Sequence, residues 1–163
     1  MRSIRGFACL VAVAALFACD GGGDPSAHSS TASARAGFGG PPVPSPVVSE
    51  VGEIFFQTPS KNIFCSLADS KVRCDIVHKS WTPPPKPSGC ELDWGNGMYI
   101  EAGKAGVTCT GDTLIGSAKG TLEYGRAYRS GSVLCDSESM GLTCRDEQTG
   151  RGFTLAVARY SIF

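Results

Sequence analysis

Six cysteines could carry chemistry in this chain, either by forming disulfides or by binding a metal. They are Cys65, Cys74, Cys90, Cys109, Cys135 and Cys144. No two of them form a Cys-x-x-Cys motif, which is typical of zinc ribbons and of redox-active thiol pairs, and His78 is the only histidine near them. We therefore expect no metal site and no redox centre. An even number of cysteines in an exported domain favours disulfides.

The spacing of the cysteines indicates how they pair. Two pairs have the same separation of nine residues and similar neighbours: Cys65 with Cys74, and Cys135 with Cys144. An odd separation places the two cysteines directly opposite each other in a β-hairpin whose turn has two or four residues. At non-hydrogen-bonded positions the Cα atoms would be about 4.5 Å apart, near the lower end of the range that a disulfide spans. Cys90–Cys109 then follows by elimination.

Four acidic residues could supply the paired carboxylates that glycoside hydrolysis uses: Glu91, Asp93, Glu101 and Asp112. Asp93 lies in an Asp-Trp-Gly-Asn-Gly sequence and Asp112 in Thr-Gly-Asp-Thr. Both contexts are typical of turns in which aspartate caps backbone amides. The chain also lacks a Gly-x-Ser-x-Gly motif, a phosphate loop, an EF-hand loop and a dinucleotide fingerprint. We expect His78 at the surface and assign no catalytic, cofactor-binding or metal-binding residue. An envelope hydrolase that uses Asp93 and Asp112 is the alternative.

Five aromatic and acidic residues, four in predicted loops and one at the end of a predicted strand, are the candidates for a ligand surface. They are Trp81, Asp93, Trp94, Asp112 and Tyr124. The proline-rich stretch Trp81–Cys90 is expected to be a stiff polyproline connection outside the sheet, anchored by Trp81. Pro84 and Pro87 have the PxxP spacing of ligands for aromatic grooves, but such partners are rare outside the cell. An inhibitor-like or purely structural module that displays this loop is a second alternative.

The elements that position these residues are predicted to be strands. Helical periodicity is absent after residue 52, and short β-rich runs are separated by Gly, Pro, Asn, Asp and Ser about every eight to twelve residues. This pattern predicts a small all-β domain, a disulfide-stapled sandwich or barrel of about eight or nine short antiparallel strands. The expected strands are Glu53–Gln57, Asn62–Leu67, Lys71–Val77, Met98–Ala102, Gly106–Thr110, Thr121–Tyr124, Ser132–Asp136, Gly141–Asp146 and Gly152–Arg159. The last is expected to bury Leu155 and Val157. The apolar C-terminus, ending at Phe163, is expected to be docked.

The N-terminus has the features of a lipoprotein signal peptide, predicted at residues 1–18. Arg2 and Arg5 precede Phe7–Phe17, an apolar run of eleven residues that is too short to span a membrane but suits a signal-peptide core. Leu16-Phe17-Ala18-Cys19 resembles a bacterial lipobox, although Phe17 is bulkier than the usual residue. We expect lipid on Cys19, whose acyl chains would hold the protein at the outer face of the cell membrane. An ordinary secretory signal is the alternative.

Composition separates a tether from the folded part and limits the partners. Residues 19–50 are mostly Gly, Ser, Ala, Thr and Pro, which predicts a disordered tether, and residues 51–163 form the domain. The chain has 15 basic and 15 acidic residues, and removal of residues 1–18 leaves 13 basic and 15 acidic residues, a net charge of −2. A chain with this charge balance has no excess of basic residues to attract the phosphates of nucleic acid. It also has no excess of basic residues that would support binding to the membrane surface.

Several motifs occur together in the domain: Thr58-Pro59-Ser60-Lys61-Asn62-Ile63-x-Cys65, Asp93-Trp94-Gly95, Cys109-x-Gly111-Asp112-Thr113, Tyr124-Gly125 and Gly150-Arg151-Gly152-Phe153. Together they resemble a family of exported, often lipid-anchored domains of unknown function from high-GC Gram-positive bacteria. The resemblance covers about Phe55 to Phe163. The family pattern has a histidine where this chain has Arg151, so no catalytic role is expected there. The family has no established activity, and the resemblance implies location and fold alone.

These observations favour a non-catalytic lipoprotein of the bacterial cell surface. The domain would bind a wall component, a small ligand or another envelope protein. No cofactor is expected, and the sequence does not predict an oligomeric state.

Overall fold

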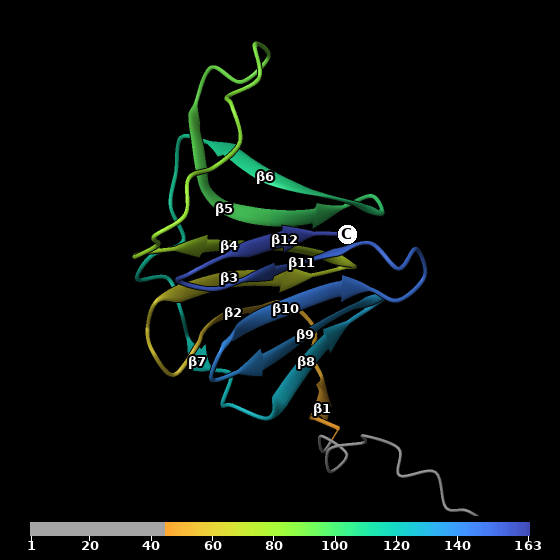
Figure 1. Cartoon of the computed structure of the whole chain (residues 1–163). Coiled ribbons are helices and arrows are strands. Elements are labelled where there is room, and N and C mark those ends of the chain that lie inside the picture. Colours follow the sequence, from red (N-terminus) through yellow and green to blue (C-terminus); the bar gives the residue numbers. More distant parts are fainter. Residues whose placement is uncertain (1–44) are drawn as a thin grey trace, which may run out of the picture. The chain divides into compact units, whose positions relative to one another are not determined.

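The computed structural model describes residues 45–163, which form twelve β-strands and no helix (Figure 1). The strands are β1 (Val47–Glu50), β2 (Ile54–Gln57), β3 (Ile63–Ala68), β4 (Lys71–Ile76), β5 (Asp93–Glu101), β6 (Lys104–Thr110), β7 (Gly120–Thr121), β8 (Arg126–Ser130), β9 (Val133–Glu138), β10 (Gly141–Asp146), β11 (Gly152–Leu155) and β12 (Tyr160–Ile162).

The strands form two six-stranded sheets, which confirms the prediction of an all-β fold. Sheet A has the order β1-β8-β9-β10-β11-β12, and sheet B has the order β6-β5-β4-β3-β2-β7. The two sheets pack as a sandwich and do not close into a barrel. The strands outnumber the eight or nine that were expected, and two pairings, β1 with β8 and β2 with β7, are parallel.

The core lies between the sheets and takes alternate side chains from the strands of both, as strand geometry requires. Phe56 on β2 meets Tyr128 on β8 edge to face, with ring centroids 5.4 Å apart. Leu67 and Met98 from sheet B and Phe153 from sheet A are fully buried in the same cluster. Each buried side chain of this size contributes roughly 1.5 to 3 kcal/mol to folding.

All three predicted disulfides are present: Cys65–Cys74, Cys90–Cys109 and Cys135–Cys144. The first and third join residues directly opposite on β3–β4 and β9–β10, with Cα atoms 4.1 and 4.0 Å apart. Both hairpins have two-residue turns, one of the two turn lengths that the odd separation allows. The two stapled hairpins belong to opposite sheets, and their cysteines are part of the common core. The second disulfide fastens the proline-rich loop to β6.

The predicted strands agree best with the structure where hydrophobic residues alternate with polar ones. β10 has the predicted bounds, and β3, β4 and β6 differ from the predicted ranges by one or two residues at an end. β1, β8 and β12 have no counterpart among the predicted strands, and the strand expected at Thr121–Tyr124 ends at Thr121 as β7. β11 stops at Leu155, so Val157, which we expected to be buried, is 52% exposed.

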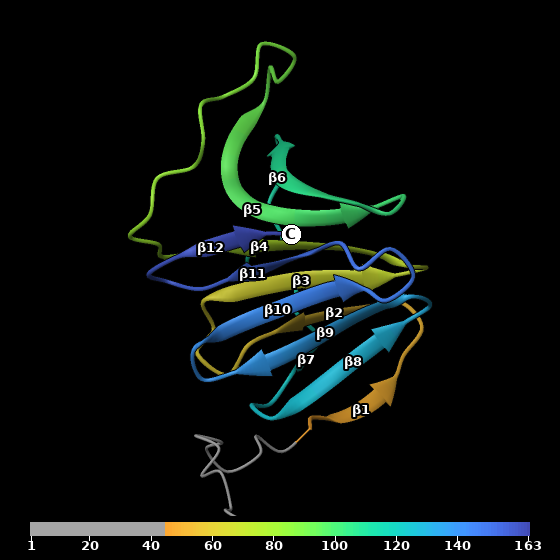
Figure 2. The ribbon, with the colours of Figure 1, turned by 45° about the vertical axis from the view of Figure 1, so that its right-hand side comes forward.

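The strand β5 begins at Asp93, well before the predicted start at Met98. The difference comes from a bulge. Between Trp94 and Met98, β5 contains two more residues than the facing part of β6, and Gly95 has a φ of 85°. The bulge bends β5, and β6 follows its curve (Figure 2). The Asp-Trp-Gly-Asn-Gly sequence therefore belongs to a bent strand and does not form the turn that we predicted.

The C-terminus is docked, as expected. Phe163 and Gly152 exchange backbone hydrogen bonds of 2.9 and 3.0 Å next to the β11–β12 pair. The other end of the domain begins earlier than its composition indicates. β1 lies within residues 19–50, the range assigned to the tether, and pairs with β8. The signal peptide at 1–18, the lipid site Cys19 and most of the tether lie outside the described residues.

Candidate functional site

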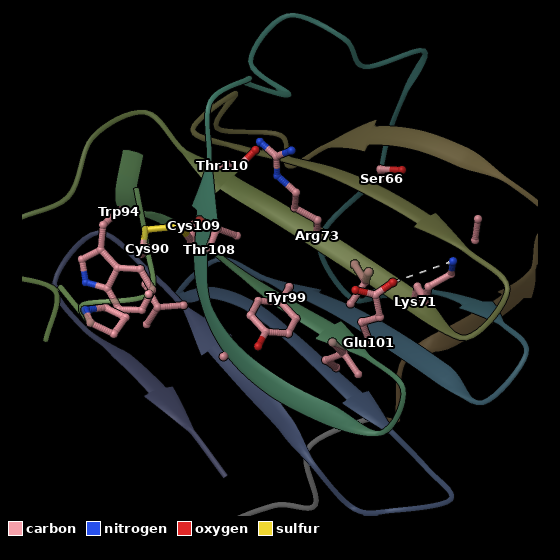
Figure 3. Close-up of a pocket in the computed structure, with 17 residues that line it drawn as sticks. Ser66, Lys71, Arg73, Cys90, Trp94, Tyr99, Glu101, Thr108, Cys109 and Thr110 are labelled. Carbon is pink, nitrogen blue, oxygen red and sulfur yellow. Dashed lines mark ion pairs between the residues drawn. A yellow bond between two sulfur atoms is a disulfide. The ribbon is translucent and has the colours of Figure 1, made fainter. Parts of the chain in front are cut away.

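A groove with a volume of about 800 Å³ lies on the outer face of sheet B. It crosses the strands β3, β4, β5 and β6 and ends against residues 87–90 of the proline-rich loop (Figure 3). This volume is in the range of sites for small molecules and short polymer segments.

The groove is built from alternate residues of the four strands, whose side chains point away from the core. Ser66, Arg73, Tyr99 and Gly106 are register partners and form one row across β3, β4, β5 and β6. Thr108 continues the β6 side of the groove, two residues beyond Gly106. The period of two in each strand therefore places these side chains on one surface.

Tyr99 is the aromatic residue in the middle of the groove (Figure 3). Its ring lies directly over Gly106, because a Cβ atom at Gly106 would come within 2.8 Å of the Tyr99 ring and hydroxyl. The glycine therefore lets the ring lie against the strand. Tyr99 is only partly buried, so part of its ring is exposed to the groove. A tyrosine held in this way loses little conformational freedom when it binds a ligand.

Thr108 is the unusual polar residue of the groove. It is 4% exposed, and its hydroxyl has no hydrogen-bond partner within residues 45–163. Buried hydroxyl groups are nearly always hydrogen-bonded, and each one left without a partner costs about 1 to 3 kcal/mol. A polar side chain retained at this cost beside a groove is a candidate for ligand contact.

The charges of the groove are largely neutralised. Lys71 and Glu101 form an exposed ion pair, with Nζ and Oε1 3.9 Å apart. The guanidinium of Arg73 donates to both oxygens of Asp75, at 3.1 and 2.9 Å, and to Asp112 Oδ1 at 2.6 Å. Burial lowers the pKa of Arg73, but the hydrogen bonds to Asp75 and Asp112 outweigh it and raise the pKa overall. Each of the two cations that line the groove in the described part of the chain, Lys71 and Arg73, is thus paired with a carboxylate.

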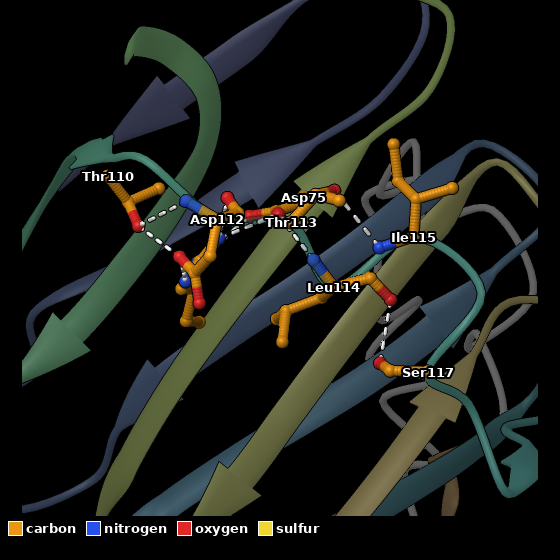
Figure 4. A network of polar contacts seen from close by, with 8 residues as sticks. Asp75, Thr110, Asp112, Thr113, Leu114, Ile115 and Ser117 are labelled. Carbon is orange, nitrogen blue, oxygen red and sulfur yellow. Dashed lines mark hydrogen bonds and ion pairs between the residues drawn. The ribbon is translucent and has the colours of Figure 1, made fainter. Parts of the chain in front are cut away.

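The segment after β6 crosses the outer face of sheet B beside the groove and is fixed by the same network (Figure 4). Asp75 is 2% exposed and accepts a 2.9 Å hydrogen bond from the backbone N–H of Leu114. Ser117 then donates to the Leu114 carbonyl at 2.6 Å, and the Lys119 N–H donates to the Phe55 carbonyl at 2.8 Å. We call residues 111–119 the crossing segment. The crossing segment covers the part of the outer face near Asp75 and Phe55, and it leaves the part around Tyr99 uncovered.

The far end of the groove is held by the proline-rich loop. The Trp94 indole N–H donates to the Pro84 carbonyl at 2.8 Å, and a Cβ at Gly95 would come within 2.5 Å of Pro83. Gly97 has no room for a side chain either, because its Cβ would come within 2.0 Å of the Cys74 carbonyl oxygen. The two glycines of the bulge therefore allow both the loop and the neighbouring strand to approach β5.

A second hollow, of about 430 Å³, brings Asp93 and Asp112 together. These are the carboxylates of the hydrolase alternative. Asp112 follows β6 in a turn, but its carboxylate accepts hydrogen bonds from Thr110 and Arg73. The Thr110 hydroxyl and the Arg73 guanidinium hold the pKa of the Asp112 carboxyl below its usual value. A general acid needs the opposite shift, so this arrangement does not suit Asp112 to proton donation.

The five sequence-predicted surface residues do not gather at one site. Trp94 lines the groove, and Asp93 and Asp112 line the second hollow. Trp81 packs on Tyr160, with ring centroids 4.5 Å apart, and its N–H donates to the Ala156 carbonyl at 2.8 Å, so it anchors the proline-rich loop as predicted. Tyr124 is 44% exposed and lines neither hollow.

Sequence reasoning missed Tyr99, Arg73 and Thr108. A usable signal was present, because polar residues alternate with apolar ones along the predicted strands: Lys71, Arg73 and Asp75 on one, and Gly106, Thr108 and Thr110 on another. Their gathering on one face depends on the pairing of β4 with β5 and of β5 with β6, which the alternation alone does not give.

Among residues 45–163 no group of three or more His, Cys, Asp and Glu side chains is arranged to hold a metal ion. The same residues include no helix that is long and apolar enough to cross a membrane.

Comparison with known proteins gives a family but no activity. Neither a curated protein nor a solved structure matches the chain significantly. The model of a family of unknown function, DUF6636, matches residues 43–163, a range that starts before β1 and extends to the C-terminus. The chain therefore belongs to DUF6636, a family of unknown function.

Proposed function

We propose that the chain is a non-catalytic binding protein of the bacterial cell envelope, exported and anchored through lipid on Cys19. Its groove on the outer face of sheet B is the ligand site. Three disulfides in a domain of this size are typical of exported proteins, because the cytosol keeps thiols reduced. The lipobox-like sequence before Cys19 supports the anchor.

The groove is the observation that carries the proposal. It combines a positioned aromatic ring, a buried hydroxyl without a partner in the described domain and a rim of paired charges. Such a combination of apolar surface with a few convergent polar groups is typical of binding sites. Within residues 45–163 no hydrogen bond joins a hydroxyl of the groove to a base that also lines it, which favours binding without reaction.

The anchor is tested by Cys19→Ala. We expect the wild-type chain to fractionate with membranes and to incorporate radiolabelled palmitate, and the variant to be released into the medium without label. Loss of the thiol removes the site of acylation, and a net charge of −2 after cleavage provides no other means of adhesion. Absence of palmitate label from the wild-type chain would contradict lipid anchoring.

Binding is tested with the secreted Cys19→Ala chain and insoluble cell-wall sacculi of the producing organism. We expect the chain to sediment with sacculi, and Tyr99→Ala in the same background to remain largely in solution. Tyr124→Ala is the matched control, because it removes an exposed tyrosine outside the groove. Equal sedimentation of both tyrosine variants would place the contact elsewhere, and soluble fragments released from the sacculi would indicate a hydrolase.

A further inference from the structure

We infer that the ligand of the groove is a neutral glycan, bound as a short stretch of sugar chain against Tyr99 and hydrogen-bonded by Thr108. This inference rests on the proposed function, because it names the ligand class of the same groove. It is carried by three features of the site: the charge balance, the aromatic surface and the buried hydroxyl.

The charge balance disfavours an anionic ligand. The two cations of the groove already have partners: Lys71 is paired with Glu101, and Arg73 with Asp75 and Asp112. Counting these five side chains, the site has one more acid than base. A phosphate polymer or an acidic sugar chain would have to displace one of these carboxylates from its cation and would leave that carboxylate unpaired beside the ligand. A ligand without charge meets no such cost.

The aromatic surface suits a sugar ring. The Tyr99 ring lies against Gly106 and stays partly exposed, so it offers an apolar area held in one orientation. One face of a pyranose consists of C–H groups that pack against an aromatic ring, while its hydroxyl groups project at the edge. The fixed ring lowers the entropy cost of binding. The same groove also has polar side chains away from the ring, among them Glu101 further along β5 and Ser66 on β3.

The hydroxyl of Thr108 matches the edge of such a ring. A sugar hydroxyl both donates and accepts a hydrogen bond, and so does the threonine side chain. Thr108 is 4% exposed and has no partner in the described domain, so a ligand hydroxyl would satisfy a group that the fold leaves unsatisfied. An extended peptide is the competing occupant, because β6 is an edge strand of sheet B. Peptide addition to that edge would use the backbone of β6 and would give no role to Tyr99 or Thr108.

The test is calorimetric titration of the secreted Cys19→Ala chain with defined hexasaccharides. Chitohexaose, cellohexaose, xylohexaose and mannohexaose are the neutral probes, and hexagalacturonate is the anionic probe of matched length. We expect at least one neutral probe to bind with a Kd below about 1 mM, the range in which weak specific ligands bind, and hexagalacturonate to bind more weakly than that probe.

Two groove variants distinguish contact from folding. Tyr99→Ala is expected to weaken binding roughly ten- to hundredfold, because it removes the buried contact area of one aromatic side chain. Thr108→Val keeps the shape of the side chain and breaks no hydrogen bond within the described domain. We therefore expect Thr108→Val to melt at the wild-type temperature or higher and to bind about three- to tenfold more weakly. Tyr99→Phe and Tyr124→Ala should bind like the parent chain.

Each result supports or overturns the inference. Binding of a neutral probe that Thr108→Val weakens without loss of stability supports it. Three results overturn it: no neutral probe binds, hexagalacturonate binds best, or wall-derived stem peptide binds and protects the β6 amides from hydrogen exchange. If sacculi are still bound through Tyr99 in those cases, the proposed function stands with another ligand. If sacculi are not bound either, both proposals fall.

Discussion

Asp136 on β9 has one carboxylate oxygen, Oδ1, that is buried without a hydrogen-bond partner in the described part of the chain. Burial, and to a lesser extent the charge of Glu138, raises the pKa of this carboxyl. Asp146, at the end of β10, shows the opposite balance. Burial would raise its pKa, but hydrogen bonds from Gln148 and its neighbours outweigh this and lower the pKa. The same residue type therefore affects stability with opposite signs at the two positions.

A raised carboxyl pKa means that the folded state binds the proton more tightly than the unfolded chain. Ionised Asp136 then costs stability at neutral pH, and the cost disappears below the unfolded pKa of about 3.9. We predict that Asp136→Asn raises the free energy of unfolding at pH 7, by less than about 1 kcal/mol because solvent screens the charge, and gives no gain at pH 3. Urea denaturation at the two pH values measures this. Asp146→Asn is the control and should be less stable than wild type at pH 7. A loss of stability in both variants at pH 7 would contradict the assignment for Asp136.

At the scale of elements, the crossing segment depends on one buried carboxylate. Asp75 holds the Arg73 guanidinium and the Leu114 N–H at once. We predict that Asp75→Asn lowers the free energy of unfolding by about 3 kcal/mol, because it leaves Arg73 short of a partner in a mostly buried position. Faster hydrogen exchange at the Leu114 amide should accompany the loss.

Asp112→Asn is the matched control for that prediction. Asp112 also contacts Arg73, but its side chain is 72% exposed, so the loss should be much smaller than for Asp75→Asn. Equal losses in the two variants would show that burial of the carboxylate is not what fixes the crossing segment.

The elements that the sequence predicts correctly are determined by nearby residues in the chain. The elements that it misses are determined by contacts with distant residues. The hairpins β3–β4 and β9–β10 follow from alternation and from cysteine spacing, and both lie within a few residues of the predicted positions. The sequence predicts a turn at the bent start of β5, because its glycines are equally suited to a turn and to a bulge. Only the nearby Cys74 carbonyl and Pro83 decide between them, and these contacts come from other elements. The position of Tyr99 in the groove also depends on contacts between β5 and other elements, which the local sequence does not give.

At the scale of the whole molecule, the sequence predicted the all-β class and the disulfides but could not give the parallel pairings. β8 consists of Arg126-Ala127-Tyr128-Arg129-Ser130, which has little apolar alternation, and it becomes a strand by pairing with β1 and β9. No local signal in the sequence distinguishes such a segment from a loop.

The three disulfides are expected to decide whether the domain folds at all. In the chain-entropy model they together contribute about 8 kcal/mol, which is comparable with the entire stability of a typical domain. We predict that the fully reduced and alkylated chain is largely unfolded at 25 °C, as measured by near-ultraviolet circular dichroism and tryptophan fluorescence. The oxidised chain, treated with the alkylating agent alone, is the control. A reduced chain with native spectra would show that the core is sufficient by itself.

The parallel pairing of β1 with β8 also sets an order of assembly. Glu50 and Arg129 form an ion pair between these strands although they are 79 residues apart in sequence, whereas each stapled hairpin joins cysteines only nine residues apart. Short loops close before long ones, since the entropy cost rises with the length of chain enclosed. A chain that crosses the membrane with its N-terminus first would deliver β1 at the start, but β1 has no partner until β8 has followed. The first strand to emerge is thus among the last to find its place, and until then the edge of β8 stays open to any other extended chain nearby.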